Sequence, residues 1–254
     1  MQRYSPEEIE ARTDLAAALR GASRLGYSEG VCNHFSMQIP GEAGRFLVNP
    51  QGLHWSEVTT DDLVLVDAQG RKISGKYTVE PTAFFIHGCI HRGKPSAKCV
   101  LHTHMPHATA LTVIEGGRLE WASQNSLKFY GRVAYDDNYN GLALDEAEGD
   151  RMCRQLTNAD VIFLASHGVI VTGPTMAAAF DDLYYLERAC MLQVLAMGTG
   201  RPLRTVDESV AVKTARQMAE ESEQAKLHFA ALKRLLDRDE PGWRGTVSGT
   251  QPAD

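Results

Sequence analysis

The sequence has no excess of positive charge and no long apolar run, and both absences restrict the classes of protein it can represent. Its 254 residues include 26 Lys and Arg against 32 Asp and Glu, which gives a formal net charge of −6. A nucleic-acid-binding surface normally needs a basic patch, and this charge balance argues against one. No run of about 18 apolar residues occurs, although a membrane-spanning helix needs one. We therefore expect neither nucleic acid nor membrane as a partner.

Cysteine is scarce and scattered. The five cysteines are odd in number, and no two of them form a C-x-x-C pair, a pattern that favours free thiols in a reducing compartment. Residues 1–8 lack the apolar core of a signal peptide. These features predict a cytoplasmic protein.

The chain contains enough apolar residues, 43% of the total, for one large domain with a substantial core. No linker divides it, so we expect a single domain over residues 1–254. Its core would span about residues 8–200, followed by a C-terminal helix over about 208–236 and a loose tail over 242–254.

Hydrophobic periodicity and turn residues predict alternating helices and strands. Ser5-Pro6-Glu7-Glu8 is a capping box with proline at the first helical position, and it predicts a helix to about Leu25. Apolar stretches predict short strands near 35–39, 46–48 and 63–66, and helices over about 81–92, 145–156 and 175–197. This order of elements is typical of a layered α/β domain.

The triplet His102-Thr103-His104 is the most informative motif, and it ends the apolar run Cys99-Val100-Leu101. Residues two apart in a strand point to the same face, so both imidazoles would converge on one point. Such a pair is half of a metal site. The alternative is that these are ordinary surface or core histidines, because an H-x-H triplet also arises by chance.

A third histidine strengthens the metal hypothesis. The apolar run Val161–Ala165 is followed by Ser166-His167-Gly168. Two buried strands that each end in histidine fit a single site at the carboxyl edge of a sheet, where open α/β sheets bind ligands. Three histidines with an open fourth position suit catalytic zinc, manganese or iron better than a closed structural site. We therefore predict a divalent metal ion, zinc first, bound by His102, His104 and His167.

Several motifs, in this order along the chain, resemble those of the class II aldolase/adducin family. They extend over nearly the whole sequence, from about Glu8 to about Trp243, and two further stretches resemble the adducin-type branch. The family motifs are Asn33–Ser36, Val48–Gly52, Leu101–Ala110 and Ser166–Gly173, and the adducin-like stretches are Tyr184–Cys190 and Leu232–Arg238.

The resemblance implies a fold, an assembly and a metal site. The fold is an α/β/α three-layer sandwich on a mixed, mostly antiparallel central sheet. The assembly is a homotetramer with the site near a subunit interface. The family's metal-binding histidines correspond to His102, His104 and His167, the residues that the spacing had already selected.

The base of the family's aldolases is missing at its usual place. Those enzymes carry a glutamate, which is both base and metal ligand, four residues before a helix histidine that corresponds here to His87. The residue at that place is Ala83. Glu80 lies three residues earlier and is our candidate base. The alternative is that Glu80 only caps the helix that begins at Pro81.

The family's phosphate-binding segments are also altered. Gln51 stands where the family has a small polar residue, and Cys32 replaces a glycine whose backbone would approach an anion. Asn33, His34, Gln51 and Gly52 remain our candidates for substrate binding.

Two tyrosines are candidates for the proton donor. The family's acidic tyrosine would align loosely near Ser123, and Tyr130 and Tyr135 are close to that position. We select Tyr130, with packing as the alternative role for both.

These residues predict a metal-dependent carbon–carbon lyase. An intact set of metal-binding histidines beside altered phosphate and base positions favours an aldolase or decarboxylase acting on a small, unphosphorylated hydroxy-carbonyl or carboxylate compound. One alternative is a non-catalytic adducin-like scaffold protein. A further alternative is a sugar-phosphate epimerase, which would need a firmer hold on phosphate.

Overall fold

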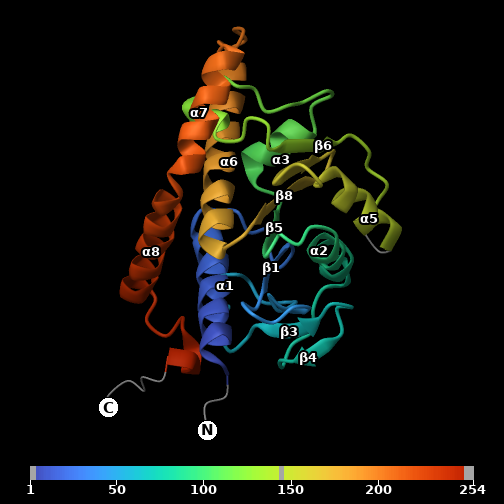
Figure 1. The fold of residues 1–254 in the computed structure, drawn as a ribbon, viewed down its shortest axis with the longest axis vertical. Coiled ribbons are helices and arrows are strands. Elements are labelled where there is room, and N and C mark those ends of the chain that lie inside the picture. Colours follow the sequence, from blue (N-terminus) through green and yellow to red (C-terminus); the bar gives the residue numbers. More distant parts are fainter. Residues whose placement is uncertain (1–3, 143–145, 249–254) are drawn as a thin grey trace.

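A computed structural model describes residues 4–142 and 146–248, which are built around one eight-stranded sheet (Figure 1). The strand order is β4-β3-β2-β1-β5-β8-β7-β6. Every neighbouring pair is antiparallel except β6 and β7, which are parallel. The mixed, mostly antiparallel sheet is therefore confirmed. The strands are β1 (His34–Gln38), β2 (Arg45–Val48), β3 (Val64–Asp67), β4 (Lys72–Ser74), β5 (Cys99–Thr103), β6 (Val133–Asp136), β7 (Val161–Leu164) and β8 (Gly168–Gly173).

Helices cover both faces of the sheet, as the three-layer prediction requires (Figure 1). Leu101 faces a core formed with α1 and α6, whereas its neighbour Val100 faces a second core formed with α2 and α5. This alternation follows from the two-residue period of a strand. The helices of this part are α1 (Pro6–Arg24), α2 (Pro81–Gly93), α3 (Pro106–Thr112), α4 (Gln124–Leu127), α5 (Glu146–Gln155) and α6 (Met176–Met197).

The N-terminal helix begins where the capping box predicted. The side chain of Ser5 accepts a hydrogen bond from the backbone N–H of Glu8, and Pro6 occupies the first turn of α1. All five cysteines are free, and Cys99 and Cys190 are buried in the core. Within the described residues, no helix has the length and apolar character needed to cross a membrane.

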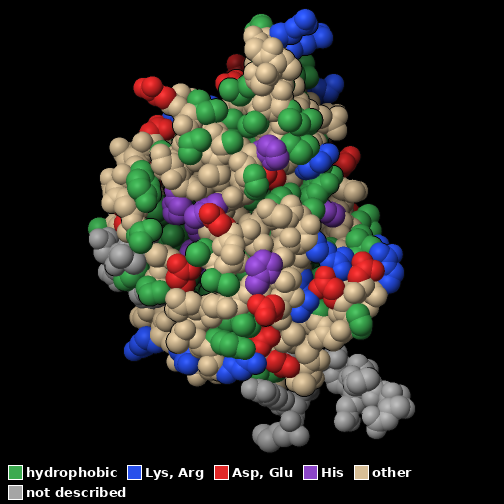
Figure 2. Space-filling view, turned by 180° about the vertical axis from the view of Figure 1, so that it is seen from behind, with side chains coloured by type: hydrophobic (Ala, Val, Ile, Leu, Met, Phe, Trp, Pro, Cys, Tyr) green, Lys and Arg blue, Asp and Glu red, His purple; other side chains and the backbone are tan. Residues whose placement is uncertain are grey.

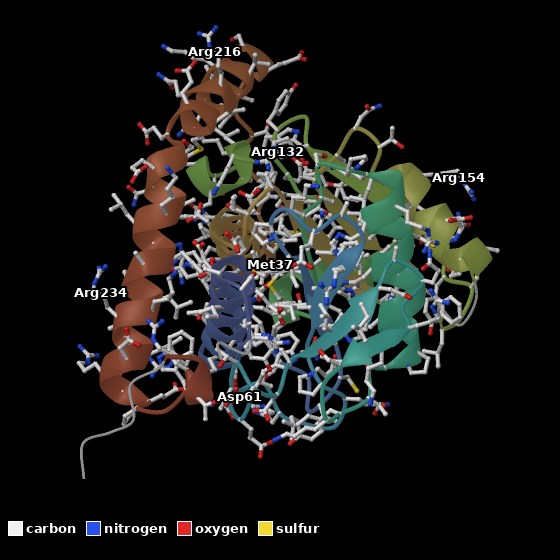
Figure 3. The ribbon with its side chains drawn as sticks, turned by 60° about the horizontal axis from the view of Figure 1, so that its bottom comes forward. Met37, Asp61, Arg132, Arg154, Arg216 and Arg234 are labelled. Carbon is white, nitrogen blue, oxygen red and sulfur yellow. The ribbon has the colours of Figure 1, made fainter. Side chains whose placement is uncertain are left out.

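The prediction of a single C-terminal helix over residues 208–236 is wrong. The structure has two helices there, α7 (Glu208–Glu220) and α8 (Ser222–Asp239), and the chain leaves helical geometry at Glu221, with φ −91° and ψ 45°. They separate because they pack on different partners: α7 contacts α4, whereas α8 packs on α6 and α1. Arg216 on α7 and Arg234 on α8 project outwards (Figure 3).

The tail expected to be loose from Gly242 onwards is folded as far as Ser248. Trp243 is buried, and its indole N–H donates a hydrogen bond to Asp237 over 2.9 Å. A short 3₁₀ helix, η1 (Gly245–Ser248), follows, and the backbone N–H of Thr246 donates to Asp61. Residues 249–254 lie outside the described part.

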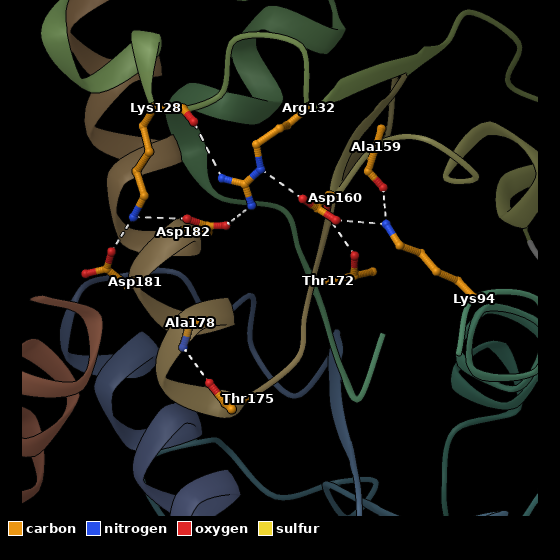
Figure 4. A network of polar contacts seen from close by, with 10 residues as sticks. All are labelled: Lys94, Lys128, Arg132, Ala159, Asp160, Thr172, Thr175, Ala178, Asp181 and Asp182. Atoms are coloured by element: carbon orange, nitrogen blue, oxygen red, sulfur yellow. Dashed lines mark hydrogen bonds and ion pairs between the residues drawn. The ribbon is translucent and has the colours of Figure 1, made fainter. Parts of the chain in front are cut away.

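An ion-pair network fixes the segment after α4 to α6 and to the end of the sheet (Figure 4). Arg132 pairs with Asp182 on α6 at 2.6 Å and with Asp160 at 2.8 Å, and Lys128 pairs with Asp181 and Asp182. Burial raises the pKa of Asp160, but hydrogen bonds from Lys94 and Arg132 outweigh it and hold the pKa below its usual value. Tyr130 lies between Lys128 and Arg132 in the sequence.

Candidate metal centre

The three predicted ligands meet at one edge of the sheet. Because β8 is antiparallel to both β5 and β7, these two strands run in the same direction and end at the same edge. His102 lies in β5 and His104 directly after it, while His167 lies in the short turn between β7 and β8. The topology therefore brings the two segments together as the sequence predicted.

The three rings form a nearly equilateral triangle. Their centroids are 5.1 Å apart for His102 and His104, 4.8 Å for His102 and His167, and 4.9 Å for His104 and His167. One nitrogen from each ring lies within 4.8 Å of the other two. Figure 2 shows a group of histidine side chains gathered on one face of the molecule, beside an acidic side chain. Such spacing allows the three nitrogens to bind one ion.

Hydrogen bonds orient two of these rings. The Nδ1 of His102 donates to the carbonyl oxygen of Val169 over 3.0 Å, and the Nδ1 of His104 donates to the carboxylate of Glu29. Both rings therefore keep a lone pair on Nε2. The Nε2 of His104 is buried without a hydrogen-bond partner in the described part of the chain, which is costly unless a ligand occupies that direction.

Burial keeps the rings of His102 and His167 neutral. Burial, followed by the neighbouring histidines, lowers the pKa of His102 well below its usual value, and burial also lowers the pKa of His167 to about 4. A metal ion binds the neutral imidazole, so these two ligands need not lose a proton at neutral pH. The orphaned nitrogen of His104 and the set of three imidazole donors together fit a divalent metal ion.

Two unusual backbone positions hold the ligands in place. Asn33 adopts φ 71° and its side-chain oxygen accepts the backbone N–H of His104 at 3.4 Å. Ser166 adopts φ 54° in the tight turn that presents His167. Asn tolerates this left-handed region because its short polar side chain bonds locally. Asn33, predicted to bind substrate, therefore supports the backbone of His104 from a buried position in this structure.

The other predicted substrate residues lie on two different parts of the sheet edge. The His34 ring is buried against that of His102, with centroids 5.0 Å apart. The side-chain oxygen of Gln51 accepts a hydrogen bond from the hydroxyl of Thr78 over 3.1 Å. This side chain is therefore engaged with Thr78. Gly52 follows with φ 87°, a conformation that favours glycine.

His34 begins a buried chain of polar side chains that the sequence did not reveal. Its Nδ1 is 2.7 Å from the Nε2 of His87, whose Nδ1 is 2.6 Å from the hydroxyl of Ser36. That hydroxyl is 2.7 Å from the Nε2 of His91, and the Nδ1 of His91 donates to the carbonyl of Ala97 over 2.8 Å. The chain thus connects the metal-site edge with the far end of α2.

Glu80 joins the other end of this chain. Its carboxylate accepts from the Thr82 hydroxyl at 3.1 Å, and the same hydroxyl is 3.3 Å from the Nε2 of His34. Glu80 occupies the N-cap position of α2, but its side chain makes no capping hydrogen bond. The side-chain contact therefore connects Glu80 with the histidines and not with the helix backbone.

The structure does not bring Tyr130 to the three histidines. Its hydroxyl donates to Glu208 on α7 over 3.0 Å, and its ring packs against Trp121. The ring of Tyr135, the other candidate, stacks on the ring of Phe163, and its hydroxyl oxygen accepts a hydrogen bond from the backbone N–H of Leu119. Both tyrosines have the packing role that was the alternative.

A tyrosine that the sequence analysis missed lies beside the site instead. The ring of Tyr139 is 6.4 Å from that of His167, and its side chain is 53% exposed. Tyr139 follows β6, the parallel neighbour of the strand that leads to His167. The parallel pairing of β6 with β7 places Tyr139 beside His167, and the sequence alone did not show that pairing.

Comparison with known proteins agrees with this geometry. Residues 13–194 match the profile of the Class II Aldolase and Adducin N-terminal domain. The chain belongs to the class II aldolase and adducin family. A putative aldolase class 2 protein of Caulobacter vibrioides is 32% identical over 95% of this chain and 94% of its own length. The family resemblance found in the sequence motifs is therefore confirmed.

The relatives include proteins named as enzymes and proteins named as adducins. The decarboxylase NovR of Streptomyces niveus is 31% identical over 87% of this chain and 84% of its own length. Alpha-adducin of Rattus norvegicus is 34% identical over 77% of this chain, but that match covers only 27% of the adducin. Membership in the family therefore includes both lyase-named proteins and adducins.

Solved structures confirm the class II aldolase fold. An aldolase II superfamily protein from Pseudomonas syringae has a TM-score of 0.89 and 34% identity, covering 95% of this chain and 98% of its own. An L-fuculose 1-phosphate aldolase from Glaciozyma antarctica has a TM-score of 0.81 and 27% identity, covering 92% of each chain.

Replacing Glu29 with glutamine should weaken metal binding. The carboxylate accepts the Nδ1 proton of His104, which fixes the ring orientation and makes its other nitrogen a better ligand. We expect the affinity of the protein for a divalent ion to fall by about tenfold to a hundredfold, measured by competition with a chromophoric chelator. Glu223→Gln, a change on the exposed face of α8, should leave the affinity unchanged; equal affinities in all three proteins would contradict the role of Glu29.

Acid should destabilise the fold partly through His91. Burial lowers the pKa of its imidazole to about 4, whereas an unfolded histidine titrates near pH ~6.5. Between pH values of about 4 and about 6.5, His91 therefore binds a proton more readily in the unfolded chain than in the folded protein. The free energy of unfolding should therefore fall as the pH drops from about 6.5 to about 4, by an amount on the order of 3 kcal/mol for this group. His91→Gln should flatten this slope in urea titrations, and His54→Gln should not.

Proposed function

We propose that this protein is a divalent-metal-dependent carbon–carbon lyase, an aldolase or decarboxylase, that acts on a small hydroxy-carbonyl or hydroxy-carboxylate compound. The observation that carries the proposal is the triangle of three imidazoles, one of which has a buried nitrogen without a hydrogen-bond partner within the described residues. His102, His104 and His167 would hold the ion, with zinc as the first choice and manganese or iron as alternatives. A bound ion would supply Lewis-acid stabilisation of the negative charge that develops when a carbon–carbon bond breaks.

The substrate that we propose carries no phosphate. Gln51 is engaged with Thr78 through both its side chain and its backbone N–H, so its loop is fixed without an anion. Cys32 occupies a position where a glycine would let the backbone approach a phosphate more closely. The NovR decarboxylase among the relatives also supports a lyase reaction without implying a sugar phosphate.

A binding protein without catalysis is the second candidate, because the chain is 34% identical to part of an alpha-adducin. Three features of this chain favour the enzyme: a complete set of three imidazoles, the Glu29 carboxylate on His104, and the carbonyl of Val169 on His102. A scaffold has no need to orient metal ligands in this way.

We also propose that the protein assembles as a cytoplasmic homotetramer with the metal site near a subunit boundary. Large apolar side chains that are exposed on α6 and on α7 are our support for an interface there, because exposed apolar patches commonly mark contact between subunits. They are Leu192, Leu195, Met197, Val210 and Val212. Light scattering of the purified protein tests the assembly.

A substrate panel tests the lyase activity. Metal-loaded protein is incubated with hydroxy-carbonyl compounds, hydroxy acids and aromatic carboxylates, and released aldehyde and carbon dioxide are measured. We expect release that disappears after chelation and returns on adding a divalent ion. Tight metal binding with no release from any compound of the panel would favour the binding protein.

A further inference from the structure

Two of the three candidate ligands lie outside the strands of the sheet. His102 belongs to β5 and is held by the pairing of that strand with β8, whereas β5 ends at Thr103 and His104 follows it. His167 lies between the end of β7 and the start of β8. Strand pairing therefore fixes the place of His102, while the backbone at His104 and His167 needs further contacts to hold it.

Helix α3 connects the two segments that carry His104 and His167. It begins at Pro106, two residues after His104, and it ends at Thr112. The carbonyl oxygen of Thr112 accepts a hydrogen bond from the backbone N–H of Ser166 over 3.0 Å, and Ser166 directly precedes His167. One end of α3 is thus joined to His104 through the chain, and the other end is hydrogen-bonded beside His167.

The first turn of α3 lacks a cap from its own segment. The side chain of Met105, at the N-cap position, makes no capping hydrogen bond, and Pro106 has no N–H to satisfy. The N–H of Thr109 donates to the carbonyl oxygen of Met105 over 2.8 Å. The N–H groups of His107 and Ala108 therefore need an acceptor from another part of the fold.

Glu187 on α6 supplies that acceptor. One oxygen of its carboxylate accepts the backbone N–H of His107 over 2.9 Å, and the other accepts the backbone N–H of Ala108 over 2.9 Å. The Nδ1 of the His107 ring lies 2.8 Å from the first of these oxygens. Glu187 is buried, and burying a carboxylate is costly unless such donors surround it. These contacts hold the first turn of α3 against α6 (Figure 1).

We propose that Glu187 is a positioning residue of the three-histidine site: its carboxylate fixes α3, and α3 fixes the relative places of His104 and His167. The inference rests on the metal-dependent function proposed above. Glu187 acts through the backbone of α3, and it is not one of the three residues whose nitrogens meet. His102 does not depend on it, because the sheet already holds that residue.

The contact requires two oxygen acceptors, so glutamine cannot replace Glu187. Glutamine has the same shape, but one of its two terminal atoms is an NH₂ group, which is itself a donor. Whichever way the amide is turned, the N–H of His107 or that of Ala108 would face another donor in a buried place, which is costly. The first turn of α3 has to move to relieve this contact, and His104 moves with it.

Cobalt(II) is the probe for the effect of Glu187→Gln, because its visible absorption bands depend on the number and geometry of its ligands. We expect the variant to bind cobalt(II) about tenfold less tightly than the wild type, at the lower end of the range for residues that support a ligand. The bands of the fully loaded variant should also change in position or intensity. A loss of global stability alone would leave the spectrum of the loaded protein unchanged.

Asp181→Asn is the matched control. Asp181 is also a buried carboxylate on α6, where it accepts a hydrogen bond from Lys128 and lies 2.7 Å from the Nδ1 of His228. These two partners lie directly after α4 and on α8, and not on α3. The control should lower the free energy of unfolding and leave the cobalt(II) affinity and spectrum unchanged. Equal losses of affinity in the two variants would overturn the proposal, because the effect would then follow from stability.

Amide hydrogen exchange tests the same contacts without any metal. The hydrogen bond to Thr112 protects the N–H of Ser166, so its exchange rate reports whether α3 still holds the segment that carries His167. In metal-free Glu187→Gln we expect this N–H to exchange at least about tenfold faster than in Asp181→Asn. Equal exchange rates in the two variants would also overturn the proposal.

The two readouts separate this inference from the proposed function. If the wild type binds cobalt(II) but releases no product from any compound of the panel, the lyase function fails, and the affinities and spectra still decide the role of Glu187. If the wild type binds no metal ion, the metal-dependent function fails, and the exchange rate of Ser166 decides whether Glu187 positions the two segments.

Glu187→Asp provides a second variant in case Glu187→Gln does not fold. It keeps a carboxylate at this place on α6, but the side chain is one methylene group shorter and cannot reach all three donors unless α3 moves. We expect the same changes in cobalt(II) affinity, absorption spectrum and Ser166 exchange. Wild-type values of all three in a folded Glu187 variant would contradict the proposal.

Discussion

His167→Ala should remove the bound metal ion and abolish turnover. Only two imidazoles would remain, and His102 and His104 are joined by one short segment, so the ion would lose the ligand that comes from the second strand. Loss of a supporting residue alone typically costs about tenfold to a hundredfold in affinity, and loss of a ligand should exceed a hundredfold. Calorimetric titration with a divalent ion measures the change, and a coupled assay for the released product measures turnover.

His54→Ala is the matched control for this prediction. The His54 ring bonds to Ser28 and Ser56 and belongs to a turn outside the triangle. Its variant should bind metal like the wild type. Full activity of a metal-free His167→Ala protein would refute the assignment of His167 as a ligand.

Gly168→Ala should damage both the sheet and the metal site. A methyl group at this position would lie 2.5 Å from the carbonyl oxygen of Thr103 and 2.7 Å from Cδ2 of His104. The backbone of β5 cannot move away without disturbing its pairing with β8, in which Thr103 faces Val169. We expect a loss of about 1–3 kcal/mol in the free energy of unfolding, together with weaker metal binding, because His104 is displaced.

Gly198→Ala provides the comparison. A methyl group there meets only ordinary contacts at 3.4 and 3.6 Å, at the C-terminal end of α6. Its effect on both measurements should be small. Urea unfolding and metal titration of the two variants test the prediction, and wild-type metal affinity in Gly168→Ala would show that His104 does not depend on this close packing.

The sequence was sufficient to predict that the three histidines lie together, because local periodicity determined their directions. The two-residue period of a strand placed His102 and His104 together, and the second apolar run placed His167 at the same edge. The outline of the fold followed from the same patterns. The break at Glu221 was not predictable, since it depends on which neighbours α7 and α8 contact in three dimensions.

The surroundings of the ligands depended on contacts between residues far apart in the sequence. Glu29 reaches His104 across 75 positions, and His34 reaches His87 across 53. No periodicity or motif spacing encodes such pairs. Tyr130 was selected because it lay near an aligned position, whereas Tyr139 reaches His167 only through the parallel pairing of β6 and β7.

Anomalous diffraction from crystals loaded with a divalent ion tests the central claim most directly. Data collected at the absorption edge of the ion locate it independently of the protein atoms. The account predicts one strong peak about 2.0–2.3 Å from one nitrogen each of His102, His104 and His167. A peak elsewhere, or none at this triangle in fully loaded crystals, would contradict it.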